Sequence, residues 1–133
     1  MSYQQALEAA GAEVLLFQSF GSYQGDWWAK VNFNNETLWV HGTYGSCSGC
    51  DAFQSEFYAD EEFCDIHYFE TSATCPDCLK RKEIYNTKLA AFGQTYLNNY
   101  TYTQDEAENA TKENLDWDSE APEVYNFITL NKI

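Results

Sequence analysis

The chain has 133 residues, of which 44% are hydrophobic and 17% aromatic, and its formal net charge is −14. The length suits one domain, predicted over residues 1–133, and the aromatic content excludes a disordered chain, because such chains are poor in large apolar side chains. The negative charge repels polyanions, so it argues against direct binding to nucleic acid or to an anionic membrane surface. We therefore expect a folded domain whose partners carry positive charge.

The first part of the chain predicts a short helix followed by strands. Residues 2–11 are predicted to form a helix that ends at Gly11, and residues 13–20 to form a strand. Residues 26–44 are predicted as a β-hairpin with a turn at residues 34–36, because apolar side chains alternate along the segment before the turn.

The long helix is the clearest prediction in the second half of the chain. It covers residues 80–98, where apolar residues recur at helical spacing and form a stripe that must face a core. The residues of this stripe are Tyr85, Leu89, Phe92 and Tyr96.

Four further elements are predicted on weaker patterns. Residues 54–63 are acidic and favour a helix, whereas residues 65–70 and 124–130 favour strands. Thr103 and Glu106 have the spacing of a capping box, which predicts the start of an acidic helix.

The acids are concentrated in two blocks of the sequence. Residues 51–70 contain seven acids and no base, and residues 105–123 contain eight acids and one lysine. Between these blocks, residues 71–104 contain four bases and two acids. We define residues 103–123 as an acidic segment of the domain, and we expect both blocks to attract basic surfaces.

The expected compartment is the cytoplasm. No stretch of the sequence approaches the length of an apolar membrane span, so no membrane partner is expected. The N-terminal residues lack the basic start and the apolar core of a signal peptide. In a reducing compartment, the five cysteines of the chain more often indicate metal or redox chemistry than disulfides.

Two Cys-x-x-Cys pairs form the strongest pattern in the sequence. Cys47 and Cys50 lie in a glycine-rich loop, and Cys75 and Cys78 lie just before the long predicted helix. The two-residue spacing lets both thiolates of a pair reach one ion, and four thiolates complete a tetrahedral zinc site. The 24 residues between the pairs exceed the gap of roughly 15–20 that is usual in zinc ribbons. Because four protein ligands leave no open position for substrate, the predicted zinc is structural.

Other residues leave the ligand set open. Cys64 or His67 can replace one of the four cysteines, and His41 precedes the first pair. For Cys64, ligation and a role as a small buried apolar residue both remain open. For His41, we favour an outward-facing or hydrogen-bonded strand residue. The predicted fold class is therefore α+β, with a small antiparallel sheet, a short N-terminal helix, a long amphipathic helix and a zinc-knuckle site.

Redox chemistry is the alternative use of the second pair. Cys75-Pro-Asp-Cys78 follows a possible strand and opens a helix, which is the context of a thiol-disulfide oxidoreductase. Such folds carry the motif near the N-terminus and have a later cis-proline loop. Here 74 residues precede the motif, and Pro122 is the only proline after it. The oxidoreductase therefore stays the alternative rather than the main prediction.

The acidic blocks predict a contact surface for a basic partner. Carboxylates that imitate a phosphate backbone can occupy a Lys/Arg channel built for DNA or RNA, whereas the simpler alternative is a solvated face that aids solubility. Trp27, Trp28 and Trp39 are candidate anchors, and Trp117 lies between two aspartates, where a contact residue and a local hydrophobic clamp are both open. The predicted partner-binding residues are Asp60, Glu61, Glu62, Asp105, Glu106, Glu108, Asp116, Trp117 and Asp118.

Two motifs carry a resemblance to known proteins. Gly21-Ser-Tyr-Gln-Gly-Asp-Trp27 and Tyr44-Gly-Ser-Cys-Ser-Gly-Cys-Asp51 resemble segments of a group of small phage and prophage proteins. The small, acidic and cysteine-bearing profile is also similar to phage anti-CRISPR proteins, some of which inhibit the RNA-guided nuclease of type II systems, and one of which holds zinc. The motif match covers residues 20–53, and within it only Cys47 and Cys50 carry over as ligands.

These patterns together predict a non-enzymatic inhibitor. The resemblance implies a phage or prophage protein in the cytoplasm of the host cell, where it would block the basic nucleic-acid channel of a CRISPR effector nuclease. Zinc would stabilise its fold, and the chain itself would bind no nucleic acid. The alternatives are the thiol-disulfide oxidoreductase with Cys75 and Cys78, and a phage accessory protein without an inhibitory target.

Overall fold

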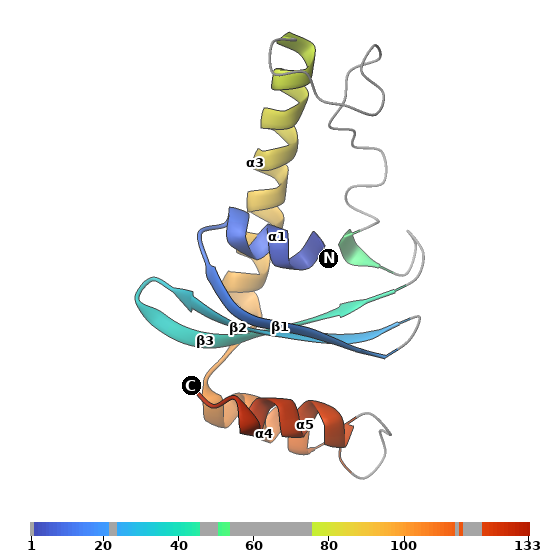
Figure 1. Ribbon diagram of the computed structural model, residues 1–133, viewed down its shortest axis with the longest axis vertical. Helices are drawn as coiled ribbons and strands as arrows, with labels where there is room; N and C mark the ends of the chain where they lie inside the picture. The colour runs from blue at the N-terminus through green and yellow to red at the C-terminus, as the bar shows by residue number, and fades with distance from the viewer. Residues whose placement is uncertain (1, 22–23, 46–50, 54–75, 114, 116–120) are drawn as a thin grey trace.

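A four-stranded antiparallel sheet lies between two layers of helices (Figure 1). The computed structural model describes residues 2–21, 24–45, 51–53, 76–113, 115 and 121–133. The predicted α+β class, the antiparallel sheet, the short N-terminal helix and the long helix are confirmed. The elements in chain order are α1 (Ser2–Ala9), β1 (Glu13–Gly21), β2 (Gly25–Phe33), β3 (Glu36–Tyr44), α3 (Pro76–Asn99), β4 (Thr101–Tyr102), α4 (Gln104–Lys112) and α5 (Ala121–Leu130).

The hairpin of β2 and β3 forms the centre of the sheet. Asn34 and Asn35 have positive φ angles of 54° and 63°, which is the backbone of a two-residue turn that matches the twist of the strands. The turn sets the register, with Phe33 opposite Glu36 and Trp28 opposite His41. The predicted hairpin is therefore confirmed, and β1 and β4 pair with its two outer edges.

Neighbouring tryptophans on β2 face the two helical layers. Trp27 is 0% exposed and belongs to the cluster beneath α1 and α3, whereas Trp28 is 4% exposed and belongs to the cluster beneath α4 and α5. This alternation follows from the two-residue period of a strand. A chain with a single covered face would expose one of the two rings.

Trp27 joins three elements on the first face. Its ring centroid lies 5.3 Å from that of Tyr3 in α1, 5.3 Å from that of Phe17 in β1 and 5.2 Å from that of Tyr96 in α3. Each aromatic pair of this kind contributes about 0.5–1.5 kcal/mol beyond the burial of its area. A Cβ on Gly42, directly opposite on β3, would collide with the Trp27 ring.

The predicted apolar stripe of α3 packs on this first face. Leu89 is buried in its cluster, and Tyr85, Phe92 and Tyr96 pack against it. The helix begins at Pro76, earlier than the sequence predicts, because proline suits the first turn of a helix, where no N–H donor is needed. In Figure 1, α3 passes α1 and its N-terminal half extends away from the sheet.

The second face is covered by α4 and α5. Thr103 caps α4, and its capping box with Glu106 is present as the sequence predicts. The strand predicted at residues 124–130 is wrong, because these residues belong to α5. Its buried residues Val124 and Ile128 are four positions apart and line one face of a helix.

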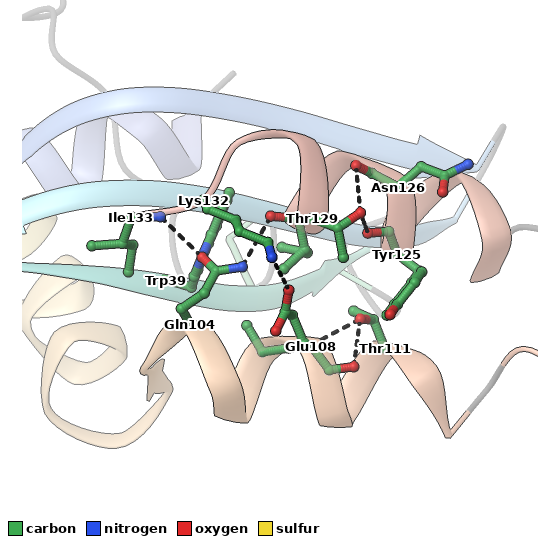
Figure 2. A network of polar contacts seen from close by, with 11 residues as sticks. Trp39, Gln104, Glu108, Thr111, Tyr125, Asn126, Thr129, Lys132 and Ile133 are labelled. Carbon is green, nitrogen blue, oxygen red and sulfur yellow. Dashed lines mark hydrogen bonds and ion pairs between the residues drawn. The ribbon is translucent and has the colours of Figure 1, made fainter.

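Gln104 fastens this layer to the sheet. Its Oε1 accepts hydrogen bonds from Nε1 of Trp39 at 2.8 Å and from the backbone N–H of Ile133 at 3.1 Å, and its Nε2 donates to the carbonyl of Ile128 at 3.1 Å (Figure 2). The side chain therefore gives the buried indole of β3 its partner and ties the end of α5 to the start of α4.

One short strand differs from the prediction, and two predicted elements are not tested by the structure. The two-residue strand β4 was not predicted, because its length gives no alternating pattern. The helix predicted at residues 54–63 and the strand predicted at residues 65–70 lie outside the described residues.

The contact between α1 and α3 depends on Gly93. A Cβ at this position would collide with the carbonyl of Ala6. Alanine is favoured over glycine inside a helix by about 1 kcal/mol, whereas overpacking at a tight contact costs about 1–3 kcal/mol. We expect Gly93→Ala to lower the free energy of unfolding, measured by urea denaturation.

The exposed residue Ala91 of the same helix supplies the matched control. Ala91→Gly is expected to destabilise by about 1 kcal/mol through helix propensity alone. A Gly93→Ala variant that is more stable than the wild type would contradict the close contact between the two helices.

Candidate functional site

The predicted zinc ligands fall largely outside the described residues. For Cys78, the backbone lies in the first turn of α3 and the side chain is not described. In the described ranges, no three His, Cys, Asp or Glu residues gather to hold a metal. The zinc-knuckle site thus stays a prediction. The ligand candidates outside the described residues are Cys47, Cys50, Cys64, His67 and Cys75.

The two ends of the first Cys-x-x-Cys loop are joined by Asp51. Its Oδ1 accepts hydrogen bonds from the backbone N–H of Gly45 and from the hydroxyl of Tyr3, both at 2.9 Å. The Tyr3 hydroxyl in turn accepts from the N–H of Phe53 at 3.1 Å. Asp51 is only 5% exposed, so its carboxylate holds both flanks of residues 46–50 inside the protein.

Tyr3 connects this clamp to the core. Burial raises the pKa of its hydroxyl above the ordinary value of 10.0, the N–H of Phe53 lowers it, and Asp51 raises it further. Because the folded-state pKa exceeds that of the unfolded chain, the stability that Tyr3 contributes is complete below pH 10.0 and is lost as the pH rises further.

We expect Tyr3→Phe to lower the free energy of unfolding at neutral pH by about 1–3 kcal/mol, because the variant removes two buried hydrogen bonds. Above pH 10.0, the difference from the wild type should shrink, since the variant has no hydroxyl to ionise at this position. Denaturant unfolding from pH 8 to pH 11 measures both effects.

Tyr125→Phe is the matched control, because no hydrogen bond of the Tyr125 hydroxyl is found among the described residues. It should leave the free energy of unfolding at neutral pH unchanged. An equal loss in the two variants would contradict the role of the Tyr3–Asp51 clamp.

The predicted acidic contact residues are described only in α4. Asp105 is exposed, and Glu106 uses its carboxylate to accept the N–H of Thr103 at 3.0 Å, which lowers the pKa of Glu106. Glu108 forms an ion pair with Lys132 at 3.6 Å (Figure 2). The other predicted contact residues, Asp60, Glu61, Glu62, Asp116, Trp117 and Asp118, lie outside the described ranges.

The prediction of three tryptophan anchors is wrong. Trp27, Trp28 and Trp39 are 0%, 4% and 0% exposed, because each fills a core cluster between the sheet and a helical layer. Trp27 and Trp39 cannot contact a partner without opening the fold, and Trp28 is reached only through a pocket that it lines. The sequence pattern failed here because both faces of the sheet are covered, so no strand tryptophan remains outside.

A pocket of about 140 Å³ opens on the α4/α5 side of the sheet. It is lined by Asp26 and Trp28 of β2, His41 of β3, Tyr102 of β4 and Thr111 of α4, with small apolar side chains of α4 and α5. Nε2 of His41 lies 2.8 Å from Oδ1 of Asp26. The indole of Trp28 stacks on the imidazole at a centroid distance of 4.6 Å.

The position of His41 confirms the hydrogen-bonded strand residue that the sequence favours. The Asp26–His41 pair and its pocket were not predicted, although the sequence contains the turn that brings these two residues together. A two-residue turn at Asn34 and Asn35 places Trp28 opposite His41 and Asp26 diagonal to it, within reach of a side-chain contact. The remaining wall comes from β4 and α5, which sequence reasoning missed or assigned wrongly.

The context of Cys78 differs from that of a thioredoxin-like site. The helix α3 begins at Pro76, as such a motif requires. The strands of the described ranges pair antiparallel in chain order, whereas the redox motif belongs to a β-α-β unit with parallel strands.

Comparisons with known proteins return no relative. No family model, no curated protein and no solved structure matches the chain. Among the helices of the described ranges, none combines the length and apolar character needed to cross a bilayer. The residues themselves are therefore the basis of the proposed function.

Proposed function

We propose that the protein is a non-enzymatic inhibitor that blocks the basic nucleic-acid channel of an RNA-guided effector nuclease. The observation that carries this proposal is the net charge of −14 on 133 residues, concentrated in the blocks at residues 51–70 and 105–123. A surface of this charge attracts a channel rich in Lys and Arg and is repelled by DNA and RNA. The channel that holds a guide–target duplex has this character.

The described part of the second block supports the proposal. Asp105 and Glu113 are exposed on or next to α4 and form no ion pair with the described residues. The ion pair of Glu108 with Lys132 spans 3.6 Å, and the Lys132 side chain is 63% exposed. This pair offsets the charge of Glu108 alone, so the carboxylates of Asp105 and Glu113 stay available to a basic partner.

The inhibitor acts by exclusion in this proposal. Carboxylates on its surface take the place of phosphates along the channel and release the counterions that DNA would release. Target DNA can then no longer enter the channel. Since such contacts are mainly electrostatic, affinity depends steeply on ionic strength.

Binding to a type II effector–guide complex tests the proposal. We expect affinity to fall by about tenfold or more between about 0.1 M and 0.5 M salt. DNA cleavage should stop when the protein is added before the target. Removing three charges from the first block, by Asp60→Asn/Glu61→Gln/Glu62→Gln, or two from the second, by Asp105→Asn/Glu113→Gln, should weaken binding by about tenfold.

The matched control for the α4 double variant is Glu13→Gln/Glu36→Gln. It makes the same change in net charge at exposed strand ends outside both blocks. Absence of binding, or equal weakening by the control, would contradict recognition through the acidic blocks.

Zinc completes the proposal as the ligand that stabilises the fold. Thiolates are the donors that structural zinc prefers, and Cys47, Cys50, Cys75 and Cys78 supply four of them. The clamp at Asp51 supports this assignment, because it fixes both flanks of the first pair. Zinc bound only by the folded chain stabilises it directly.

We expect one zinc ion per chain in the purified protein, measured by elemental analysis and native mass spectrometry. Chelation should lower the melting temperature, and Cys47→Ser should abolish zinc binding, whereas Ser46→Ala should not. Cys64→Ser tests whether Cys64 is a ligand, because zinc should be lost in this variant only if Cys64 binds it. Metal-free protein whose thiols react at neutral pH would contradict the zinc site and favour the oxidoreductase of Cys75 and Cys78.

A further inference from the structure

The pocket between the sheet and the α4/α5 layer offers hydrogen-bond acceptors. The Asp26 carboxylate accepts only, so its 2.8 Å contact requires that Nε2 of His41 carries the hydrogen. In the neutral ring, Nδ1 is then an acceptor. Thr111 Oγ1 donates its single hydrogen to the carbonyl of Ala107 at 2.9 Å or of Glu108 at 3.1 Å, which leaves lone pairs on the oxygen. A ligand that uses these acceptors must therefore supply donors.

Charge and shape point to a cation. Asp26 supplies a full negative charge, and the aromatic rings of Trp28 and Tyr102 line the same pocket. Aromatic rings attract organic cations that approach within about 6 Å. The C-terminal turn of α4 and the N-terminal turn of α5 both reach the pocket, and their opposite partial charges largely cancel. The negative charge of the Asp26 carboxylate therefore determines that the pocket attracts a cation.

The overall charge of the chain is also negative. Its formal net charge is −14. A cation that approaches the pocket therefore meets a net attractive field, whereas an anion is repelled.

The volume limits the size of the ligand. A cavity of about 140 Å³ is close to the roughly 150 Å³ that accommodates benzene in an engineered protein cavity. A planar guanidinium with one methyl group fits within this volume, and a larger molecule can place only its cationic head there.

We propose that this pocket binds a guanidinium or a primary ammonium group. Asp26 pairs with the cation, His41 and Thr111 accept its N–H groups, and Trp28 and Tyr102 form the aromatic walls. The group comes from a free small amine or guanidine, or from a Lys or Arg side chain of a partner protein. The cation site stands without the inhibitor role, and only the second source rests on the proposed function.

Methylguanidinium chloride is the probe, and N-methylurea is its uncharged isostere. We expect methylguanidinium to shift the ¹H–¹⁵N resonances of Trp28, His41 and Thr111 in a saturable manner, while N-methylurea leaves them unchanged. Asp26→Asn keeps an acceptor for His41 but removes the charge, so affinity should fall by about tenfold or more, as expected for the loss of a charge-assisted hydrogen bond.

Two further variants control for net charge and for folding. Glu13→Gln makes the same change in net charge at the exposed start of β1, outside both acidic blocks, and should bind methylguanidinium like the wild type. Ala110→Leu fills the pocket with all charges retained, and it should abolish binding even if Asp26→Asn folds poorly. The dispersion of the amide spectrum reports folding for each variant.

Three results would overturn the cation site. These are the absence of saturable shifts, equal shifts with N-methylurea, and equal loss of affinity in Glu13→Gln and Asp26→Asn. Competition between methylguanidinium and the effector complex assigns the source to a partner's side chain, and saturable binding without competition assigns it to a free cation. If the effector is not bound at all while methylguanidinium is, the proposed inhibitor role fails and the cation site holds.

Discussion

The register of the β2–β3 hairpin is the constraint on which the rest of the structure depends. Because side chains alternate along a strand, a slip of one residue would move Trp27 and Trp28 to the wrong faces. Trp27 would then lose its contacts with α1, β1 and α3. Asn34 and Asn35 adopt the positive φ angles of a two-residue turn, which admits one register. The turn residues thus determine which side chains of the hairpin face each helical layer.

The same register builds the polar pocket. It sets Trp28 opposite His41, and it brings Asp26 close enough to bond the imidazole at 2.8 Å. The pocket is closed by α4 and α5, which the Gln104 hydrogen bonds hold against Trp39 of β3 (Figure 2). The hairpin register therefore determines both the fold and the candidate pocket. The side chain of Gln104 positions the acidic helix α4 and also accepts the hydrogen bond of the buried Trp39 indole.

The sequence predicted the parts of the fold that depend on local patterns. The hairpin, the apolar stripe of α3 and the Thr103 capping box are recognisable because spacing and turn chemistry suffice. The strand predicted at residues 124–130 was wrong, because a short apolar run fits a strand or a helix equally well until its packing partners are known. The pocket was not predicted because it combines five elements, one of which, β4, has only two residues. The zinc ligands and most acidic contacts lie outside the described residues and stay predictions.

Nuclear Overhauser contacts between the aromatic rings and the opposite strand test this account most directly. The register predicts cross-peaks between the rings of Trp28 and His41, whose centroids lie 4.6 Å apart, and between the Trp27 ring and the α-hydrogens of Gly42, which lies opposite Trp27. Cross-peaks between Trp27 and His41, with none between Trp28 and His41, would show a hairpin slipped by one residue. That result would contradict both the two-faced core and the cation pocket.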